Sequence, residues 1–423
     1  MDLGKGSNKS SANSPAVIGL IAVITVLLGV GGLVIAQLTP VLFPDQASAE
    51  ANQIDQLFKV MLGIGGSIFL LVQGVLIYSI IRYRKRQGDN TDGPTVHGNV
   101  TLEVVWTAIP AVVVLGLVIY SYQVWVDIQE PKEDELVVHV EARRFGWTFL
   151  YEDERLTAGN GNGNENSNAT RFPAPDLHVY AGQPVRLVME TEDVIHSFWV
   201  PEMRIKQDLL PGRTTEMRIT PQLVDGRASD EYPLRYRVVC TELCGSGHGA
   251  MFTYVYLHED EESYMQWVDS SVESVLNPPE DPVLNGMRIM ASGVYGCQSC
   301  HALQDSREGM TLSWDAVTGP SLQGIADRAS TRVSGQPAEE YLYESIYDPG
   351  AYIVPGYGNI MNQYQFVNPD AAHYLPKPDA EAITAYLCTV SDEFTPEELA
   401  ENPLCDFDNL LSYSEMYTMD GMN

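Results

Sequence analysis

The sequence predicts a multidomain membrane protein in which transmembrane helices precede a β-rich domain and a helical C-terminal domain. Three runs without a charged side chain, residues 16–38, 60–81 and 104–126, are 22 or 23 residues long. At about 1.5 Å per residue, each run is long enough to cross a bilayer core of about 30 Å. Beyond the third run, short β-rich segments come first, and segments with a helical pattern follow.

The acidic charge of the chain falls outside the apolar runs. The 423 residues contain 25 Lys+Arg and 56 Asp+Glu, which gives a formal net charge of −31. Residues 1–125 carry seven basic and seven acidic side chains, so the whole excess belongs to the remaining 298 residues. Because an acidic surface repels nucleic acid, the composition excludes DNA and RNA binding. The uneven charge predicts a membrane anchor that carries an acidic external part.

Basic residues give the orientation of the apolar runs. The cluster at 82–86, Arg-Tyr-Arg-Lys-Arg, directly follows the second run, and the positive-inside rule places it in the cytoplasm. The third run then leads outward, so that everything after Asp127 is external. Lys5 and Lys9 before the first run fit a cytoplasmic start. Residues 50–130 are therefore predicted to form a transmembrane helical hairpin in a multi-pass protein.

The N-terminal apolar segment, residues 1–49, has two interpretations. The small residues Ala47-Ser48-Ala49 resemble a signal-peptide cleavage site, which would leave Glu50 as the first residue. The apolar run is longer than a usual signal core, which favours a retained signal anchor. Both interpretations remain open on the sequence.

Glu103 is a single carboxylate at the cytoplasmic end of the third run. It is either a hydrated interfacial group or, as carboxylates near membrane depth often are, part of a proton path.

The segment 131–277 is predicted to be an antiparallel β-sandwich or barrel, because turn residues separate its short β-rich runs. Residues 127–135 are expected to link it to the membrane part, and the Gly/Asn-rich stretch 159–168 is expected to be a loop. The predicted strands are residues 136–141, 178–191, 216–220, 234–239 and 252–257.

Soft metal ligands crowd the end of this segment. Cys240, Cys244, His248 and Met251 lie within twelve residues, and His196 lies upstream. Thiolate, imidazole and thioether together suit copper better than zinc or a hard cation. The alternative, a Cys240–Cys244 disulfide with an incidental His and Met, leaves the ordered spacing unexplained.

A second motif, C-x-x-C-H, consists of Cys297, Cys300 and His301. It is typical of covalent haem c attachment, with the histidine as an axial ligand. A thioredoxin-like redox pair would need a βαβ context, and a zinc site would need a second cysteine pair; neither is visible. The proline-rich linker at 278–282 and a predicted helix at 284–294 precede the motif.

The pattern C-x-E-x-C-G-x-x-H-x-x-M at 240–251, with D-V-I-H-S upstream, resembles the binuclear copper A site of cytochrome c oxidase subunit II. The resemblance extends over roughly residues 55–275 and implies a cupredoxin-like Greek-key barrel on a two-helix hairpin. It implies that Glu242 faces a magnesium ion shared with subunit I, and that Glu103 is the entrance of a proton path. The implied copper ligands are two bridging thiolates, two imidazoles, a thioether and a backbone carbonyl: Cys240, Cys244, His196, His248, Met251 and Glu242.

One stretch departs from the family pattern. Where the family has Q-W-x-W, this chain has Arg144-Phe145-Gly146-Trp147. If the first tryptophan receives electrons from a soluble cytochrome c, Phe145 replaces it here, which puts direct docking on this domain in doubt. Trp147 is expected to be barrel packing.

The segment 278–390 resembles an all-α class I cytochrome c. Gly-Pro-Ser-Leu at 319–322 is similar to the turn that follows the haem in that family, and Met361 is the implied sixth ligand by its position. Residues 379–390 are expected to form the terminal helix that packs on the first.

The remaining cysteines, Cys388 and Cys405, have no metal motif around them. An external, oxidising location favours a disulfide, which would hold the acidic tail 391–423 onto this domain; two unpaired thiols are the alternative.

Together, the two motifs resemble subunit II of caa-type haem–copper oxidases from bacterial inner membranes. The resemblance implies that an external donor reduces haem c, and that the electron passes through copper A to subunit I, where oxygen is reduced to water and protons are translocated. Implied partners are subunit I, other oxidase subunits, and a donor such as a cytochrome c, a blue copper protein or a neighbouring respiratory complex. The copper A subunit of a nitric oxide reductase and a membrane-tethered periplasmic electron carrier remain alternatives.

Overall fold

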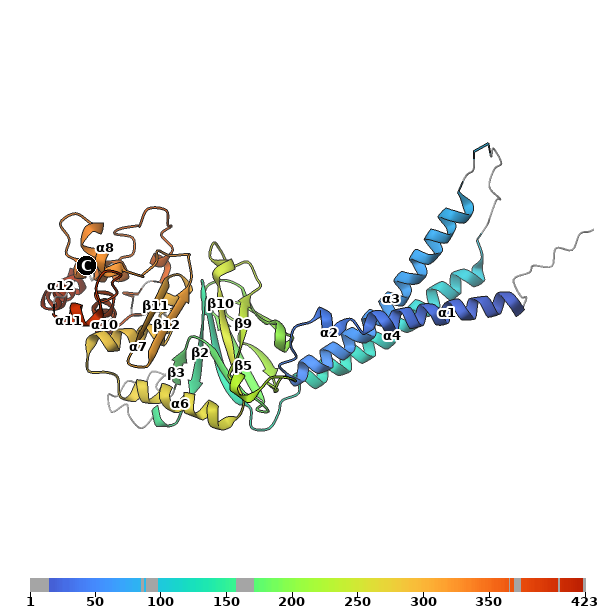
Figure 1. Cartoon of the computed structure of the whole chain (residues 1–423), viewed down its shortest axis with the longest axis horizontal. Coiled ribbons are helices and arrows are strands. Elements are labelled where there is room, and N and C mark those ends of the chain that lie inside the picture. Colours follow the sequence, from blue (N-terminus) through green and yellow to red (C-terminus); the bar gives the residue numbers. More distant parts are fainter. Residues whose placement is uncertain are drawn as a thin grey trace, which may run out of the picture. The chain divides into compact units, whose positions relative to one another are not determined.

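The computed structural model describes residues 15–84, 87–88, 98–156, 171–364, 366–368, 374–401 and 404–420. The chain forms two compact units, Met1–Glu130 and Pro131–Asn423, and Figure 1 shows a helical first unit and a second unit of strands followed by helices. The predicted loop at 159–168, together with Lys5, Lys9, Lys85 and Arg86, lies outside the described residues.

The first unit consists of α1 (Pro15–Ala36), α2 (Thr39–Leu42), α3 (Ala49–Tyr83) and α4 (Val100–Gln129). By length and composition, α3 and α4 can each cross a membrane, and they contain the second and third predicted runs. Helices α1 and α3 approach closely, since a Cβ atom on Gly32 would lie 3.1 Å from the Cβ atom of Ser67.

Side-chain caps fix the beginnings of both long helices. The backbone N–H of Ala51 donates to the Ser48 hydroxyl at 3.0 Å, and that of Leu102 donates to the Asn99 side chain at 3.2 Å. Such caps satisfy amide groups that have no partner within the helix. Cleavage after Ala49 would therefore remove the N-cap of α3.

The second unit begins with ten strands in two five-stranded sheets. One has the order β3-β2-β1-β5-β8 and the other β4-β10-β9-β6-β7. Alternate residues of β1 are buried, as expected when one sheet face packs on a core. The strands are β1 (Leu136–Arg143), β2 (Gly146–Glu152), β3 (Arg171–Ala174), β4 (Leu177–Tyr180), β5 (Val185–Thr191), β6 (His196–Val200), β7 (Ile205–Leu209), β8 (Thr215–Ile219), β9 (Leu234–Cys240) and β10 (Phe252–His258).

The sandwich confirms the predicted β-domain and its cupredoxin-like fold, but three details of the prediction were wrong. The sheets are not purely antiparallel, because β1 pairs with β5 and β10 with β4 in parallel. The predicted strand 178–191 is two strands, because Ala-Gly-Gln-Pro turns the chain at Gly182, whose φ is +87°. The charged linker is shorter than expected, because α4 continues to Gln129.

Helix α6 (Glu261–Leu276) follows the sandwich, and a helical region begins with α7 (Pro282–Ala291). Its further elements are β11 (Ala302–Arg307), β12 (Met310–Asp315), α8 (Ile325–Arg332), α9 (Ala338–Tyr347) and α10 (Lys377–Leu387). The expectation of an all-α domain was wrong in one respect, since β11 and β12 form an antiparallel hairpin. Its two-residue turn has positive φ at Glu308 and Gly309, the geometry that matches the twist of paired strands.

Helices α7 and α10 cross at Gly286. A Cβ atom there would lie 2.5 Å from the carbonyl carbon of Ala382 and 2.8 Å from the Cβ atom of Tyr386. The first and last helices of the predicted domain therefore pack together as expected, and the absent side chain permits the contact.

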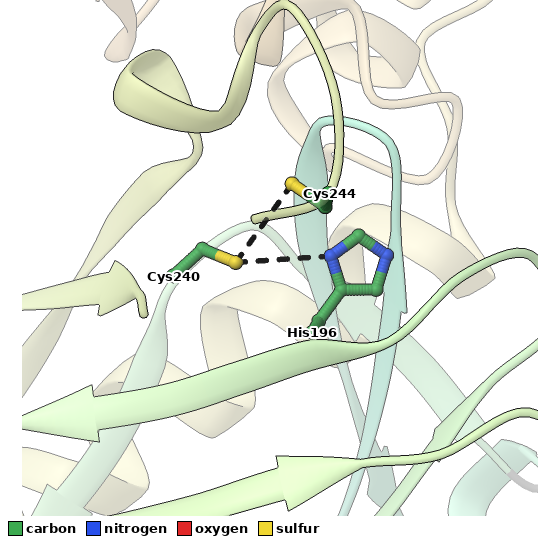
Figure 2. A group of neighbouring side chains, drawn as sticks. All are labelled: His196, Cys240 and Cys244. Atoms are coloured by element: carbon green, nitrogen blue, oxygen red, sulfur yellow. Dashed lines mark hydrogen bonds between the residues drawn. The ribbon is translucent and has the colours of Figure 1, made fainter. Parts of the chain in front are cut away.

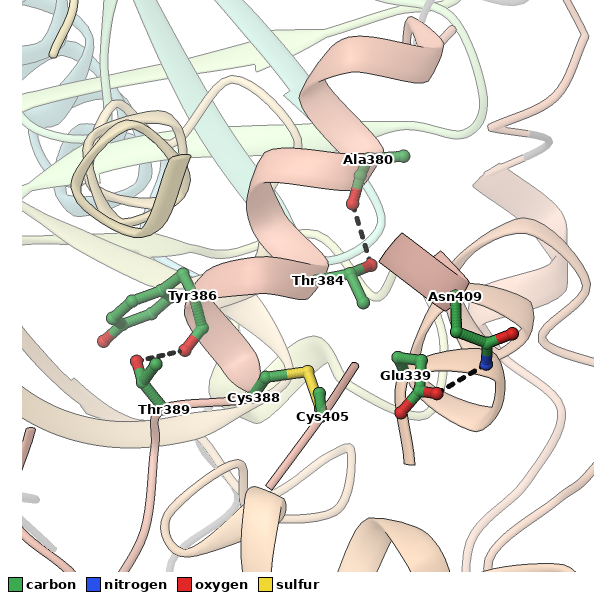
Figure 3. Close-up of a disulfide and its surroundings, with 8 residues drawn as sticks. All are labelled: Glu339, Ala380, Thr384, Tyr386, Cys388, Thr389, Cys405 and Asn409. Atoms are coloured by element: carbon green, nitrogen blue, oxygen red, sulfur yellow. Dashed lines mark hydrogen bonds between the residues drawn. A yellow bond between two sulfur atoms is a disulfide. The ribbon is translucent and has the colours of Figure 1, made fainter. Parts of the chain in front are cut away.

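The chain after α10 is held on the helical region by the Cys388–Cys405 disulfide, which confirms the predicted pairing (Figure 3). The segment predicted as an acidic tail contains two helices, α11 (Pro396–Glu401) and α12 (Phe407–Asp420). At the start of α12, the Asn409 amide donates to Glu339 at 2.6 Å.

Candidate functional site

Strand pairing brings the predicted copper ligands together. Cys240 ends β9, and its register partner on β6 is Phe198, two residues after His196. The loop between β9 and β10 is tied to β6 where the Thr241 N–H donates to the Ser197 carbonyl at 3.0 Å. Residues that are 44 positions apart in the sequence thus share one end of the sandwich.

All six predicted copper ligands lie around the two sulfurs. The Cys240 sulfur is 3.9 Å from the Cys244 sulfur, 3.8 Å from His196 Nδ1 and 3.3 Å from the Glu242 carbonyl oxygen. Figure 2 shows His196 and both thiols facing one another. The Cys244 sulfur is 3.6 Å from His248 Nδ1 and 3.7 Å from Met251 Sδ.

This geometry is not a disulfide, since a disulfide joins its sulfurs at about 2.05 Å. His196, Cys240 and Cys244 are all buried and place their ligand atoms within 4.8 Å of one another. Together with the half-buried His248 and the buried Met251, this set of two thiols, two imidazoles and a thioether fits copper by ligand softness.

Hydrogen bonding prepares one thiol for metal binding. The interaction with Cys244, supported by His196 and opposed by burial, lowers the pKa of Cys240 to about 3. The same interaction raises the pKa of Cys244. Since the thiolate is the metal-binding form of cysteine, the lowered pKa of Cys240 favours metal binding.

The Asp193 carboxylate fixes the orientation of His196. The His196 Nε2–H donates to Asp193 Oδ1 at 2.9 Å, which directs His196 Nδ1 toward Cys240. Arg144 donates to the other oxygen of Asp193 through its backbone N–H at 2.8 Å and its Nε at 3.1 Å. Burial raises the pKa of Asp193, but hydrogen bonds from His196, Val194 and Arg144 outweigh it and hold the pKa well below its ordinary value.

Phe145 and Trp147, the aromatic residues of the stretch that differs from the family pattern, pack against the predicted copper ligands. Phe145 is 2% exposed, and a Cβ atom on Gly247, in the loop between β9 and β10, would lie 2.6 Å from the Phe145 Cγ atom. Trp147, also 2% exposed, meets the His196 ring edge-on with centroids 6.3 Å apart. Both residues are buried in the barrel, as expected of Trp147.

The C-x-x-C-H motif lies on the wall of an apolar pocket in the helical region. His301 Nδ1 donates to the Pro320 carbonyl at 2.7 Å, which leaves Nε2 as the acceptor nitrogen. Burial lowers the pKa of His301, with partial opposition from that hydrogen bond, so its imidazole is neutral. Burial also raises the pKa of Cys297 to about 12.

The pocket brings the predicted haem residues together. Cys297, Cys300, His301 and Met361 all line it, with Met290, Leu342, Ile346 and Leu387 among its apolar walls. Two thiols, a neutral imidazole and a thioether on an apolar pocket fit a covalently held haem. Met290 is buried and lines the pocket as well.

Glu103 and Glu242 are placed differently from the buried ligands. Glu103 lies in the first turn of α4 and is exposed. The Glu242 carbonyl faces the cluster, while the residue as a whole is exposed.

Sequence reasoning assigned no role to Asp193, Arg144 or the Pro320 carbonyl, which orient the two key histidines. The role of Asp193 could have been predicted from the sequence, because a carboxylate three residues before a ligand histidine can reach the ring nitrogen that does not face the metal. The other two depend on contacts that only the fold creates.

Residues 34–124 match the transmembrane domain of cytochrome c oxidase subunit II, and residues 174–257 match its periplasmic domain. Cytochrome c oxidase subunit 2 of Synechocystis sp. is 33% identical over 54% of this chain and 75% of its own length. The protein of that name from Thermostichus vulcanus is 33% identical over 60% of this chain and 85% of its own length. The solved periplasmic domain of subunit II from Bradyrhizobium japonicum is 20% identical over 34% of this chain and 97% of that chain, with a TM-score of 0.26.

Members of this family bind copper A and work with subunit I in a haem–copper oxidase, and the buried His/Cys/Cys cluster of this chain is consistent with that role. The chain therefore belongs to the cytochrome c oxidase subunit II family, as a membrane-anchored subunit through which electrons enter an oxidoreductase complex.

Proposed function

We propose that this chain carries two redox centres in series, a haem c in the C-terminal helical region and copper A in the sandwich. The observation that carries the proposal is the presence of two complete ligand sets in one chain, one around the sulfurs of Cys240 and Cys244 and one on the pocket at Cys297, Cys300 and His301. When bound, both centres take up and release single electrons, which suits transfer from an external donor to subunit I.

At the copper site, the chain supplies ligands whose positions are fixed in advance. The residues that would hold the copper centre are Cys240 and Cys244 through their thiolates, His196 and His248 through their imidazoles, Met251 through its thioether and Glu242 through its backbone carbonyl. Burial of the sulfurs excludes water, and Asp193 fixes the orientation and tautomer of His196. A rigid ligand set would keep the structural change small when the copper centre gains or loses an electron.

At the proposed haem site, Cys297 and Cys300 would hold the group through their sulfurs, and His301 and Met361 would be its iron ligands. The hydrogen bond from His301 to Pro320 fixes the ring, so that the neutral Nε2 can bind iron.

Other residues connect the chain to its complex. Glu242 contributes its side chain to a magnesium site shared with subunit I, and Glu103 forms the entrance of a proton path at the first turn of α4. We place the chain in a bacterial inner membrane as a multi-pass protein, with both redox centres on the periplasmic side. Its donor is a cytochrome c, a blue copper protein or a neighbouring respiratory complex.

The test is the metal and haem content of the purified chain. We expect two coppers and one haem that stays attached to the polypeptide after extraction with acid acetone. Zinc in place of copper would refute the copper assignment, and extractable haem would refute covalent attachment. Oxygen uptake with a reduced cytochrome c would then separate an oxidase from a nitric oxide reductase.

A further inference from the structure

A glycine of the sandwich lies against the haem-binding motif. Gly146 opens β2 between Phe145 and Trp147, and a Cβ atom on it would lie 3.1 Å from the Cβ atom of Ser299, with the Ser299 hydroxyl closer still. Gly146 is not among the glycines with positive φ. The backbone therefore permits a side chain at this position, and Ser299 leaves no room for one.

A second contact lies beside the first, within the same compact unit Pro131–Asn423. A Cβ atom on Gly293 would lie 2.6 Å from the Cβ atom of Pro175, which precedes β4. Between the two contacts, Gln298 has a buried side-chain oxygen without a hydrogen-bond partner among the described residues. Ser299 itself is 7% exposed. The segment that carries the haem-binding thiols is thus packed directly on the copper domain.

The residues next to Gly146 lead to the copper cluster. The Trp147 ring meets the His196 ring with centroids 6.3 Å apart and an interplanar angle of 63°. His196 Nδ1 is 3.8 Å from the Cys240 sulfur. On the other side, Ser299 directly precedes Cys300 of the C-x-x-C-H motif. A short run of contacts, Ser299, Gly146, Trp147 and His196, therefore connects the two ligand sets.

We propose that Gly146 is a positioning residue that sets the closest approach of haem c to copper A, and that electrons cross at the Gly146–Ser299 contact. The inference rests on the proposed function. In the transfer, the haem iron goes from ferrous to ferric and the oxidised copper pair gains the same electron; no bond forms or breaks. Because electron-transfer rates fall steeply with distance, a side chain at position 146 acts by separating the two domains.

The test is the rate of internal electron transfer in the intact oxidase that contains the variants Gly146→Ala and Gly146→Leu. After rapid reduction of haem c, its reoxidation by copper A is followed by stopped-flow absorbance. We expect the rate to fall progressively, more for leucine than for alanine, because the larger side chain separates the two domains further. Copper content, covalent haem and both reduction potentials should stay at wild-type values, a combination that simple loss of packing would not produce.

Two further variants make the test specific to the contact. Ser299→Gly removes the atoms that a Cβ at position 146 would meet, so Gly146→Ala/Ser299→Gly should recover the wild-type rate. Gly116→Ala is the matched control, because it lies in α4 outside both ligand sets, has no atom within 4 Å of its added Cβ and has no positive φ. Its internal rate should equal that of the wild type.

An unchanged rate in Gly146→Leu with both centres intact would overturn the inference. If the leucine variant fails to incorporate copper or haem, the alanine pair decides: recovery by Ser299→Gly supports the contact, and a slow double variant overturns it. Absence of copper or haem from the wild-type chain would instead refute the proposed function, so the two failures are distinguishable.

Discussion

Single side chains at the copper site have separable roles in binding and orientation. The two sulfurs lie 3.9 Å apart, each beside a different imidazole. Asp193 accepts a hydrogen bond from the His196 imidazole, and among the described residues no hydrogen bond joins it to either sulfur. Substitution of either cysteine should therefore abolish the copper centre, whereas substitution of Asp193 should only change the properties of that centre.

Cys244→Ser should abolish the mixed-valence absorption and electron paramagnetic resonance signals of copper A, because a serine oxygen cannot bridge two coppers as a thiolate does. The haem band should survive, since its ligands lie on a separate pocket. Retention of a two-copper signal in this variant would contradict the bridging role of Cys244.

Met361→Ala should do the converse at the haem. Loss of the thioether should change the visible spectrum and lower the haem reduction potential, because a methionine axial ligand raises it. Copper A should keep its spectrum in the same sample. A haem spectrum identical to the wild type would show that another residue is the sixth ligand.

A pair of histidines in the sandwich, the half-buried His178 and the buried His258, predicts acid sensitivity. His178 Nδ1 lies 2.9 Å from His258 Nε2, and the His178 ring stacks on Trp267 at 3.9 Å. Burial, and then the neighbouring His258, lower the pKa of His178 well below 6.5, and burial lowers that of His258. The unfolded chain binds more protons below about pH 6.5, so folding stability is lost as the pH falls through that value.

His178→Phe should reduce this pH dependence, because phenylalanine keeps the stacked ring but cannot be protonated. The measurement is the thermal unfolding midpoint at pH 7 and pH 5, followed by tryptophan fluorescence. The difference between the two midpoints should be smaller in the variant. Equal differences in variant and wild type would show that other groups cause the acid sensitivity.

Among the helices and strands, those with a clear apolar pattern in the sequence were predicted, and those without one were missed. The second and third uncharged runs lie in α3 and α4, α1 contains the first run up to Ala36, and the strand that ends at Cys240 was placed within one residue. The hairpin at 302–315 was missed because its strands lie in a domain assigned by resemblance to an all-α family, although Glu308-Gly309 is a usable turn signal. Helices α11 and α12 were missed because an acidic composition outweighed a weak apolar pattern, and packing on the disulfide region decided the outcome.

The disulfide that anchors α11 and α12 provides a test at this scale. Its cysteines are 17 residues apart, and closing a loop of about this length stabilises a fold by roughly 3 kcal/mol in the chain-entropy model. Cys388→Ala/Cys405→Ala should lower the unfolding free energy of the helical region by about that amount, measured by urea titration of the haem absorbance.

The copper A spectrum is the internal control, because its ligands lie outside this region. A shift of both transitions by the same amount would indicate that the two regions unfold together rather than separately.

For the whole molecule, charge rather than shape predicts how the donor is recognised. Residues 127–277 carry 13 basic and 27 acidic side chains, whereas residues 278–423 carry 5 and 22. Basic groups that would interrupt the field are therefore rarer in the segment 278–423 than in the segment 127–277. A charge of one sign raises the local concentration of an oppositely charged partner and speeds its encounter. Phe145, which stands where the family has a tryptophan, is buried and offers no docking surface on the copper domain.

We therefore expect electrons from a basic soluble cytochrome c to enter through the helical region. Steady-state oxygen uptake by the intact oxidase should fall as ionic strength rises, because the Debye length shortens to about 10 Å at 0.1 M salt. Cys297→Ala/Cys300→Ala, which cannot attach haem, should lose most of this activity and its salt dependence while copper A stays loaded. If that variant kept wild-type turnover and the same dependence on salt, the donor would be docking on the copper domain directly, and the acidity of the helical region would serve only solubility.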